Sequence, residues 1–420
     1  EIAQCLVGSE MCIRDRNVRY DGSLKASVIL KDLAPFVPAL SRFEEPLDLN
    51  LVFSGHGKHL DCPTLQLANH HGLMIAGEAA LSNWDAGMDM YIYGKLGNLT
   101  MTKEGINVLM TNLTGKVPPI LQRLDYIRFN GEAAGYLHDL TLTGLFHTGA
   151  GMVKTDVMMS IDEQSMSRTY SGSVASADLD LGKLLNQEKK FGKVDFNVEL
   201  KGFNYKNRYP ESYIKGIISS FEYSQYQYEN IMLDGVYKDG GFNGRLSMDD
   251  ANGSVQIDGN FNVAKTIPDF NLKASVKNLR PHDLHLSDKY ENASISLGLT
   301  ADFTGKSIDD MNGRISLDSL QLNAPDEGGC FLDNLTITAG QVSGEKELRI
   351  NSSFMTAVIR GDYSYHTIPA SVVKTVQRYI PSLLTIKDNM PEPHNNFQFD
   401  ICLENTEVLS KLFQIPLELY

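Results

Sequence analysis

The amino-acid sequence predicts an all-β protein with a few short helices, built as an elongated, curled antiparallel sheet that forms a repetitive, taco-like β-groove. Three observations predict this fold class. Apolar and polar residues alternate with a period of two along most of the chain. Glycine- and aspartate-rich turns separate the alternating runs, and helical periodicity is rare and short.

The first residues differ from the rest of the chain. Residues 5–16 read CLVGSEMCIRDR, which has neither strand alternation nor a helical face and resembles translated sequencing-adaptor DNA. We therefore expect residues 1–16 to be an artefact or disordered, and we exclude them from fold reasoning. Residues 17–420 are expected to be one continuous repetitive β-groove segment of a longer protein, because a new extended run begins at residue 415.

The alternating runs predict the strands. Seven runs are especially regular: 47–53, 194–200, 255–263, 270–276, 295–303, 315–322 and 397–403. Turn signals lie between such runs at 239–241, 249–253 and 326–329. Strands joined in this way are typical of an antiparallel meander.

Short helices are expected near four ranges: 33–40, 118–124, 368–384 and 405–413. A strand followed by a turn or helix with an anchoring leucine recurs along the chain, and the anchors are Leu33, Leu181, Leu284 and Leu409. Their spacing is irregular, so the sequence predicts a multi-strand unit reused with loops of varying length rather than a tight solenoid.

Composition narrows the possible functions. Lys and Arg number 38 against 52 Asp and Glu, a net charge of −14 that disfavours nucleic-acid binding. No run reaches the roughly 18 apolar residues needed to cross a bilayer. Outside residues 1–16 the three cysteines Cys62, Cys330 and Cys402 are widely spaced, so they predict neither a disulfide framework nor a paired-cysteine zinc site.

Candidate metal and catalytic residues are few. The densest group of potential ligands lies at 56–71, but in a strand His56 and His59 would face opposite sides because their offset is odd. The chain has no HExxH or GxSxG motif, and the aspartate pairs at 249–250 and 309–310 have the setting of turns. We expect no enzyme activity, no cofactor and no metal site.

The apolar face of a strand must be covered by other parts of the protein or by a ligand, and the expected helices are too few to cover it. One interpretation is an open groove whose apolar floor holds acyl chains, each buried CH₂ contributing about 0.8 kcal/mol. The other is a closed core in which the same side chains pack on one another. The lipid-groove candidates are Val194, Phe196, Val198, Val255, Ile257, Phe270, Leu272, Ala274, Val276, Ile295, Leu297, Leu299, Ile315 and Leu317.

Several segments carry a family resemblance. LAPFVPAL at 33–40, LDLGKLL at 179–185 and ENTEVLSKL at 404–412 resemble the middle of TamB-like proteins, members of the AsmA-like group of the Gram-negative envelope. The hairpin segments FNGRLSM at 242–248 and DGNFNV at 258–263 are similar in style. The resemblance covers residues 17–420.

The resemblance implies a β-groove that crosses the periplasm, anchored to the inner membrane by a segment absent from this chain. It implies phospholipid transport between inner and outer membrane, with acyl chains as ligands, and an outer-membrane barrel assembly partner. The family supplies no catalytic residues. Two alternatives stay open: a scaffold for outer-membrane protein assembly and secretion, acting through exposed sheet edges, and a structural β-rod or adhesin with a closed core.

Overall fold

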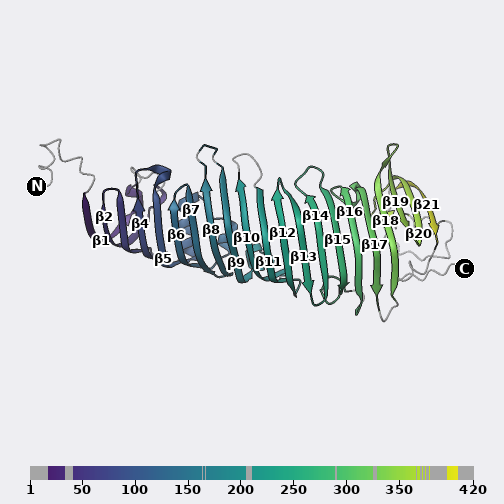
Figure 1. Ribbon diagram of the computed structural model, residues 1–420, viewed down its shortest axis with the longest axis horizontal. Coiled ribbons are helices and arrows are strands. Elements are labelled where there is room, and N and C mark those ends of the chain that lie inside the picture. The colour runs from purple at the N-terminus through teal and green to yellow at the C-terminus, as the bar shows by residue number, and fades with distance from the viewer. Residues whose placement is uncertain are drawn as a thin grey trace, which may run out of the picture. The chain divides into compact units, whose positions relative to one another are not determined.

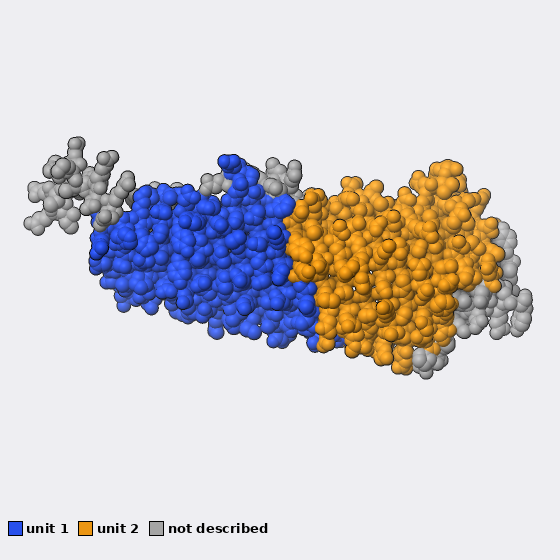
Figure 2. Space-filling model, viewed as in Figure 1, with its two compact units in different colours: residues 1–208, 216–227 blue, residues 209–215, 228–420 orange. Residues whose placement is uncertain are grey.

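The computed structural model describes residues 18–33, 41–162, 164–165, 167–204, 211–288, 291–324, 329–365, 367–368, 371, 374, 378 and 395–404. The chain divides into two compact units, coloured separately in Figure 2. Unit 1 comprises residues 1–208 and 216–227, and unit 2 comprises residues 209–215 and 228–420.

Unit 1 is built on a run of long strands. They are β1 (Arg19–Ile29), β2 (Pro46–His56), β3 (His59–Ala68), β4 (Leu73–Ser82), β5 (Tyr91–Thr102), β6 (Tyr126–Tyr136), β7 (Asp139–Thr148), β8 (Gly151–Ile161), β9 (Arg168–Asp180) and β10 (Phe191–Asn204). The helical elements between them are η1 (Leu30–Leu33), η3 (Gly87–Asp89), α1 (Lys103–Thr114), α2 (Pro119–Gln122) and α3 (Leu181–Leu185).

Unit 2 has the same style of strands after β11 (Glu211–Tyr223), whose residues are divided between the units, as are those of β12, whose first two residues belong to unit 1. Its strands are β12 (Tyr226–Lys238), β13 (Gly241–Asp250), β14 (Gly253–Asn262), β15 (Asp269–Leu279), β16 (Ser294–Thr304), β17 (Asn312–Asn323), β18 (Cys330–Val342), β19 (Glu345–Ser352), β20 (Met355–Asp362) and β21 (Asn396–Leu403). One 3-10 turn, η4 (Ile308–Asp310), precedes β17.

Within each unit, strands that follow one another in the chain pair antiparallel, as Figure 1 shows. The 21 described strands belong to one sheet that is not closed, and strand accounts for 68% of the residues that the structure describes, against 9% helix. The predicted fold class is therefore confirmed. All seven regular runs of the sequence contribute to strands, namely β2, β10, β14, β15, β16, β17 and β21.

The helices differ in part from expectation. The helix α2 coincides with the segment expected near 118–124, whereas the longer α1 was not expected. Thr102 caps α1 by accepting a hydrogen bond from the Gly105 amide. Of the segment expected at 33–40, only Leu33 is described, as the end of η1, while most of 368–384 and all of 405–413 lie outside the described residues. No described helix is long and apolar enough to cross a membrane.

Aromatic rings pack over glycines on neighbouring strands. Phe129 contacts Phe146 at a centroid distance of 4.5 Å and lies against Gly131 and Gly144. A Cβ atom added at Gly144 would meet the Phe129 ring and would lie 2.7 Å from the carbonyl oxygen of Asn130. These two glycines therefore leave the space that the ring fills.

Replacing Gly144 with alanine should destabilise the fold by about 1–3 kcal/mol, the usual cost of overpacking. The matched control is Gly94→Ala on β5, where a Cβ would meet no atom within 4 Å. That change should shift stability by less than about 1 kcal/mol, in either direction. Urea unfolding of the two variants measures the difference, and equal midpoints would contradict this packing.

Candidate apolar ligand-binding face

In unit 2 the strand register places apolar residues opposite apolar residues across every pair of strands. Leu246 of β13 faces Ile257 of β14, which faces Ala274 of β15, and Leu299 of β16 faces Leu317 of β17. Directly paired residues point to the same side of an antiparallel sheet. We call the resulting surface the apolar face of unit 2.

The structure brings the sequence candidates of unit 2 together on this one face. They are Val255, Ile257, Phe270, Leu272, Ala274, Val276, Ile295, Leu297, Leu299, Ile315 and Leu317. All eleven are half-buried, neither fully enclosed nor freely exposed. Large side chains that are less than 2% exposed are rare among the described residues, and the two in unit 2, Leu284 and Leu332, lie outside this candidate set.

Unit 1 has an apolar face of the same kind. Leu24, Leu51 and Leu65 face one another on β1, β2 and β3. Further along the same surface, Phe129 pairs with Phe146, and Val174 pairs with the candidate Val198. The candidates Val194, Phe196 and Val198 therefore belong to the apolar face of unit 1, and Val194 is buried there.

The opposite face of the sheet is polar. In unit 2, Asp234, Arg245, Asp258 and Lys273 follow one another across four strands. The Arg245 Nε atom lies 2.5 Å from an Asp258 carboxylate oxygen. Hydrogen bonds from Gln256 and Arg245 lower the pKa of Asp258. Charged side chains on this side of the sheet can be hydrated and can form ion pairs, so this side does not have to be covered by other elements.

In unit 1, helices cover one margin of the apolar face. Antiparallel strands alternate in direction, so η1, α1, α2 and α3 all lie at the same ends of the strands, which we call the covered margin. Ile106 of α1 is 1% exposed and packs with Ile127, Leu179 and Val194. The expectation that helices are too few to cover the sheet is therefore wrong for this margin, and Val194 and Phe196 pack beneath the helices.

Polar contacts fix these helices in place. The Lys183 ammonium of α3 lies 2.6 Å from an Asp125 carboxylate oxygen and donates to the Gly149 carbonyl at 3.0 Å. The hydrogen bond from Lys183 lowers the pKa of Asp125.

Unit 2 has a covered margin without a regular helix. Residues 280–286 form turns after β15, and Leu284 is fully buried there, with its carbonyl accepting a hydrogen bond from the Tyr228 hydroxyl at 2.8 Å. Ala293, Leu322, Ala324 and Cys330 form a buried cluster along the same margin.

The last strands of unit 2 are covered from the other margin. Tyr363, Tyr365 and Ile368 pack over apolar residues of β18, β19 and β20 that include Ala339, Leu348 and Ile359. We call residues 363–368 the cover segment, of which residue 366 lies outside the description. Within the described residues, the apolar face of unit 2 thus has a covered stretch on β18–β20 and an uncovered stretch on β12–β17.

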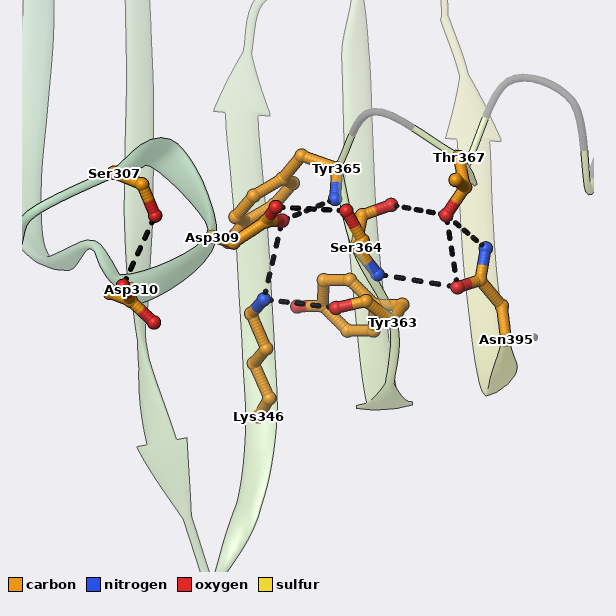
Figure 3. Close-up of polar contacts among 9 residues, drawn as sticks. All are labelled: Ser307, Asp309, Asp310, Lys346, Tyr363, Ser364, Tyr365, Thr367 and Asn395. Atoms are coloured by element: carbon orange, nitrogen blue, oxygen red, sulfur yellow. Dashed lines mark hydrogen bonds and ion pairs between the residues drawn. The ribbon is translucent and has the colours of Figure 1, made fainter. Parts of the chain in front are cut away.

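Figure 3 shows the polar contacts that hold the cover segment. The Lys346 ammonium lies 4.7 and 4.5 Å from the ring centroids of Tyr363 and Tyr365, and it donates to the Tyr363 carbonyl at 3.0 Å. The Asp309 carboxylate accepts from the Tyr365 amide at 2.6 Å and from the Ser364 hydroxyl at 2.8 Å. Burial is the largest cause of the raised pKa values of both tyrosines. These contacts explain why a lysine lies at the border of an apolar surface.

The histidine cluster is arranged differently from the prediction. Gly57 and Lys58 form a tight turn, so His56 and His59 are direct cross-strand partners on one face, with ring centroids 5.3 Å apart. The odd-offset argument was wrong because it assumed an unbroken strand. Within the described residues, no group of three or more His, Cys, Asp or Glu side chains could hold a metal ion.

Sequence reasoning missed several residues of the apolar face of unit 2. Tyr237, Phe242, Leu246, Phe261 and Phe303 share the apolar face of unit 2 with the candidates. Each lies at an even offset from its apolar neighbours along its own strand. Aligning the runs across the turns would therefore have found them.

His71 links three segments at the covered margin of unit 1. Its Nδ1 atom lies 2.8 Å from Glu104 at the start of α1, and its Nε2 atom lies 2.9 Å from Glu45. The Thr102 hydroxyl donates to the His71 carbonyl at 2.7 Å. The hydrogen bond to Glu104, together with the two carboxylate charges, raises the pKa of His71 against the opposing effect of burial.

A raised folded-state pKa means that protonated His71 stabilises the fold. This contribution is complete below the unfolded pKa of about 6.5, while the glutamates stay ionised above about 4.3, and it is lost as pH rises through the folded value. We expect His71→Gln to lower the urea midpoint at about pH 5.5 and to leave it nearly unchanged at about pH 8.5. An equal loss at both pH values would rule out a role for the charged imidazole.

Comparison with known proteins gives no relative for this chain. No protein-family model, no curated protein and no solved structure matches it. The function is therefore proposed from the geometry of the two faces and from the resemblance stated above.

Proposed function

We propose that this chain is part of a non-enzymatic lipid conduit, in which the acyl chains of phospholipids lie on the apolar faces of the sheet. The observation that carries the proposal is the continuous, half-buried apolar surface of β12–β17 in unit 2, built by register from one apolar pair after another. Each leucine or phenylalanine side chain removed from water contributes roughly 1.5–3 kcal/mol. An acyl chain on this surface would supply that burial.

The proposed mechanism is passive. Acyl chains slide along the apolar face because successive rows of aliphatic side chains offer similar contacts, and no bond is made or broken. Following the resemblance, we place the protein in the periplasm of a Gram-negative envelope, anchored to the inner membrane through a segment outside this chain. There it would move phospholipid between inner and outer membrane and work with an outer-membrane barrel partner.

Photo-crosslinking tests whether the apolar face binds lipid. A photoreactive amino acid is placed at Leu272 or at Lys273, adjacent residues of β15 that point to opposite faces. We expect phospholipid adducts at Leu272 and none at Lys273. Absence of adducts at both positions would contradict the conduit and favour the closed rod or the scaffold.

A substitution in the apolar face should block lipid binding without unfolding the sheet. Leu299→Asp places a carboxylate among the half-buried residues of β16, where an ionised group in contact with acyl chains is unfavourable. Thr300→Asp is the matched control, since Thr300 is exposed on the polar face of the same strand. We expect loss of bound phospholipid only for Leu299→Asp, measured by mass spectrometry of the purified protein, with circular dichroism verifying the fold. Equal lipid content in both variants would contradict the proposal.

A further inference from the structure

The two margins of the uncovered stretch in unit 2 differ in chemistry. One is the covered margin, which contains Leu284. The other carries the turns at 239–240, 263–268 and 305–311, and we call it the open margin. We propose that a phospholipid on this stretch is oriented across it, with its polar headgroup at the open margin and its chain ends toward the covered margin. This inference rests on the proposed lipid function.

A row of aromatic side chains borders the apolar face at the open margin. Five consecutive strands, β12–β16, each contribute one ring at the same register position, and we call Tyr237, Phe242, Phe261, Phe270 and Phe303 the aromatic row. The ring centroids of Phe242 and Phe261 lie 5.8 Å apart, and those of Phe270 and Phe303 lie 4.8 Å apart. Tyr237 and Phe261 remain 38% and 37% exposed.

The side chains toward the covered margin are aliphatic. Val255 pairs with Val276, which pairs with Leu297, near the ends of the strands opposite the aromatic row. Beyond them Leu284 is fully buried. The covered margin thus contains a fully buried residue, whereas two rings at the open margin stay more than a third exposed.

This difference between the two margins fixes the orientation of an amphiphile. Moving a phosphate or ammonium group out of water costs much more free energy than burying one CH₂ group of an acyl chain provides. The headgroup must therefore stay at a hydrated border. The aromatic row provides that border, and ring faces also attract ammonium groups. Such a contact already exists at the open margin of this unit, between the Lys346 ammonium and the rings of Tyr363 and Tyr365.

Two photoactivatable phosphatidylethanolamines test the orientation, one with a diazirine in the headgroup and one with a diazirine at the end of an acyl chain. Each is bound to the full chain and irradiated, and the crosslinked residues are mapped by mass spectrometry. We expect the headgroup probe to label Phe242 and Phe261 and the chain-end probe to label Val255 and Val276. If both probes label both pairs of residues, or if the headgroup probe labels the valines and the chain-end probe the phenylalanines, the proposed orientation is wrong. The conduit proposal would not be affected by either result. Absence of label from the whole apolar face would overturn the conduit itself.

A pair of phenylalanine variants provides a second test. Phe261→Ala removes one member of the aromatic row, whereas Phe331→Ala removes a phenylalanine that is 60% exposed on the polar face of β18. We expect Phe261→Ala to reduce labelling of the neighbouring rings by the headgroup probe while chain-end labelling of Val255 persists. Phe331→Ala should change neither. Equal effects of the two variants would contradict a role for the row.

Discussion

The structure depends on one constraint, the register that pairs apolar residues with apolar residues across the hairpins of unit 2. A slip of one residue would turn all the apolar side chains of a strand to the polar side. The ladder from Asp234 through Arg245 and Asp258 to Lys273 opposes such a slip on the other face, because the slip would place these charges on the apolar surface. The two faces therefore specify the same alignment.

Bulges add a residue to one strand and allow the sheet to bend without losing its faces. The register shifts between Val276 and Leu279, where Asn278 takes a left-handed conformation with φ of 48°. Another shift, between Val194 and Phe196, lies opposite Asp178 with φ of 54°. Asparagine and aspartate tolerate this conformation better than other non-glycine residues, and bulges increase the local twist.

Much of the fold could be predicted because alternation is a local property that survives in each strand separately. The apolar set from Val255 to Leu317 could be predicted for the same reason. The contacts of the covering elements could not, since Ile106 packs against sheet residues that are distant in the sequence, although the apolar residues of α1 do lie at helical spacing, at 106, 109, 110 and 113. His56 and His59 were misplaced because the turn between them has only two residues. The role of Lys346 in holding the cover segment could not be predicted, because its partners Asp309 and Tyr363 are distant from it in the sequence.

The covering elements of unit 1 bear on how such a chain can change length during evolution. The elements η1, α1 and α3 follow β1, β5 and β9, so an even number of strands separates one from the next. Insertion or deletion of a whole hairpin would keep later covering elements on their original margin, whereas gain or loss of a single strand would move them to the opposite one. Homologous chains are thus expected to differ in length by pairs of strands.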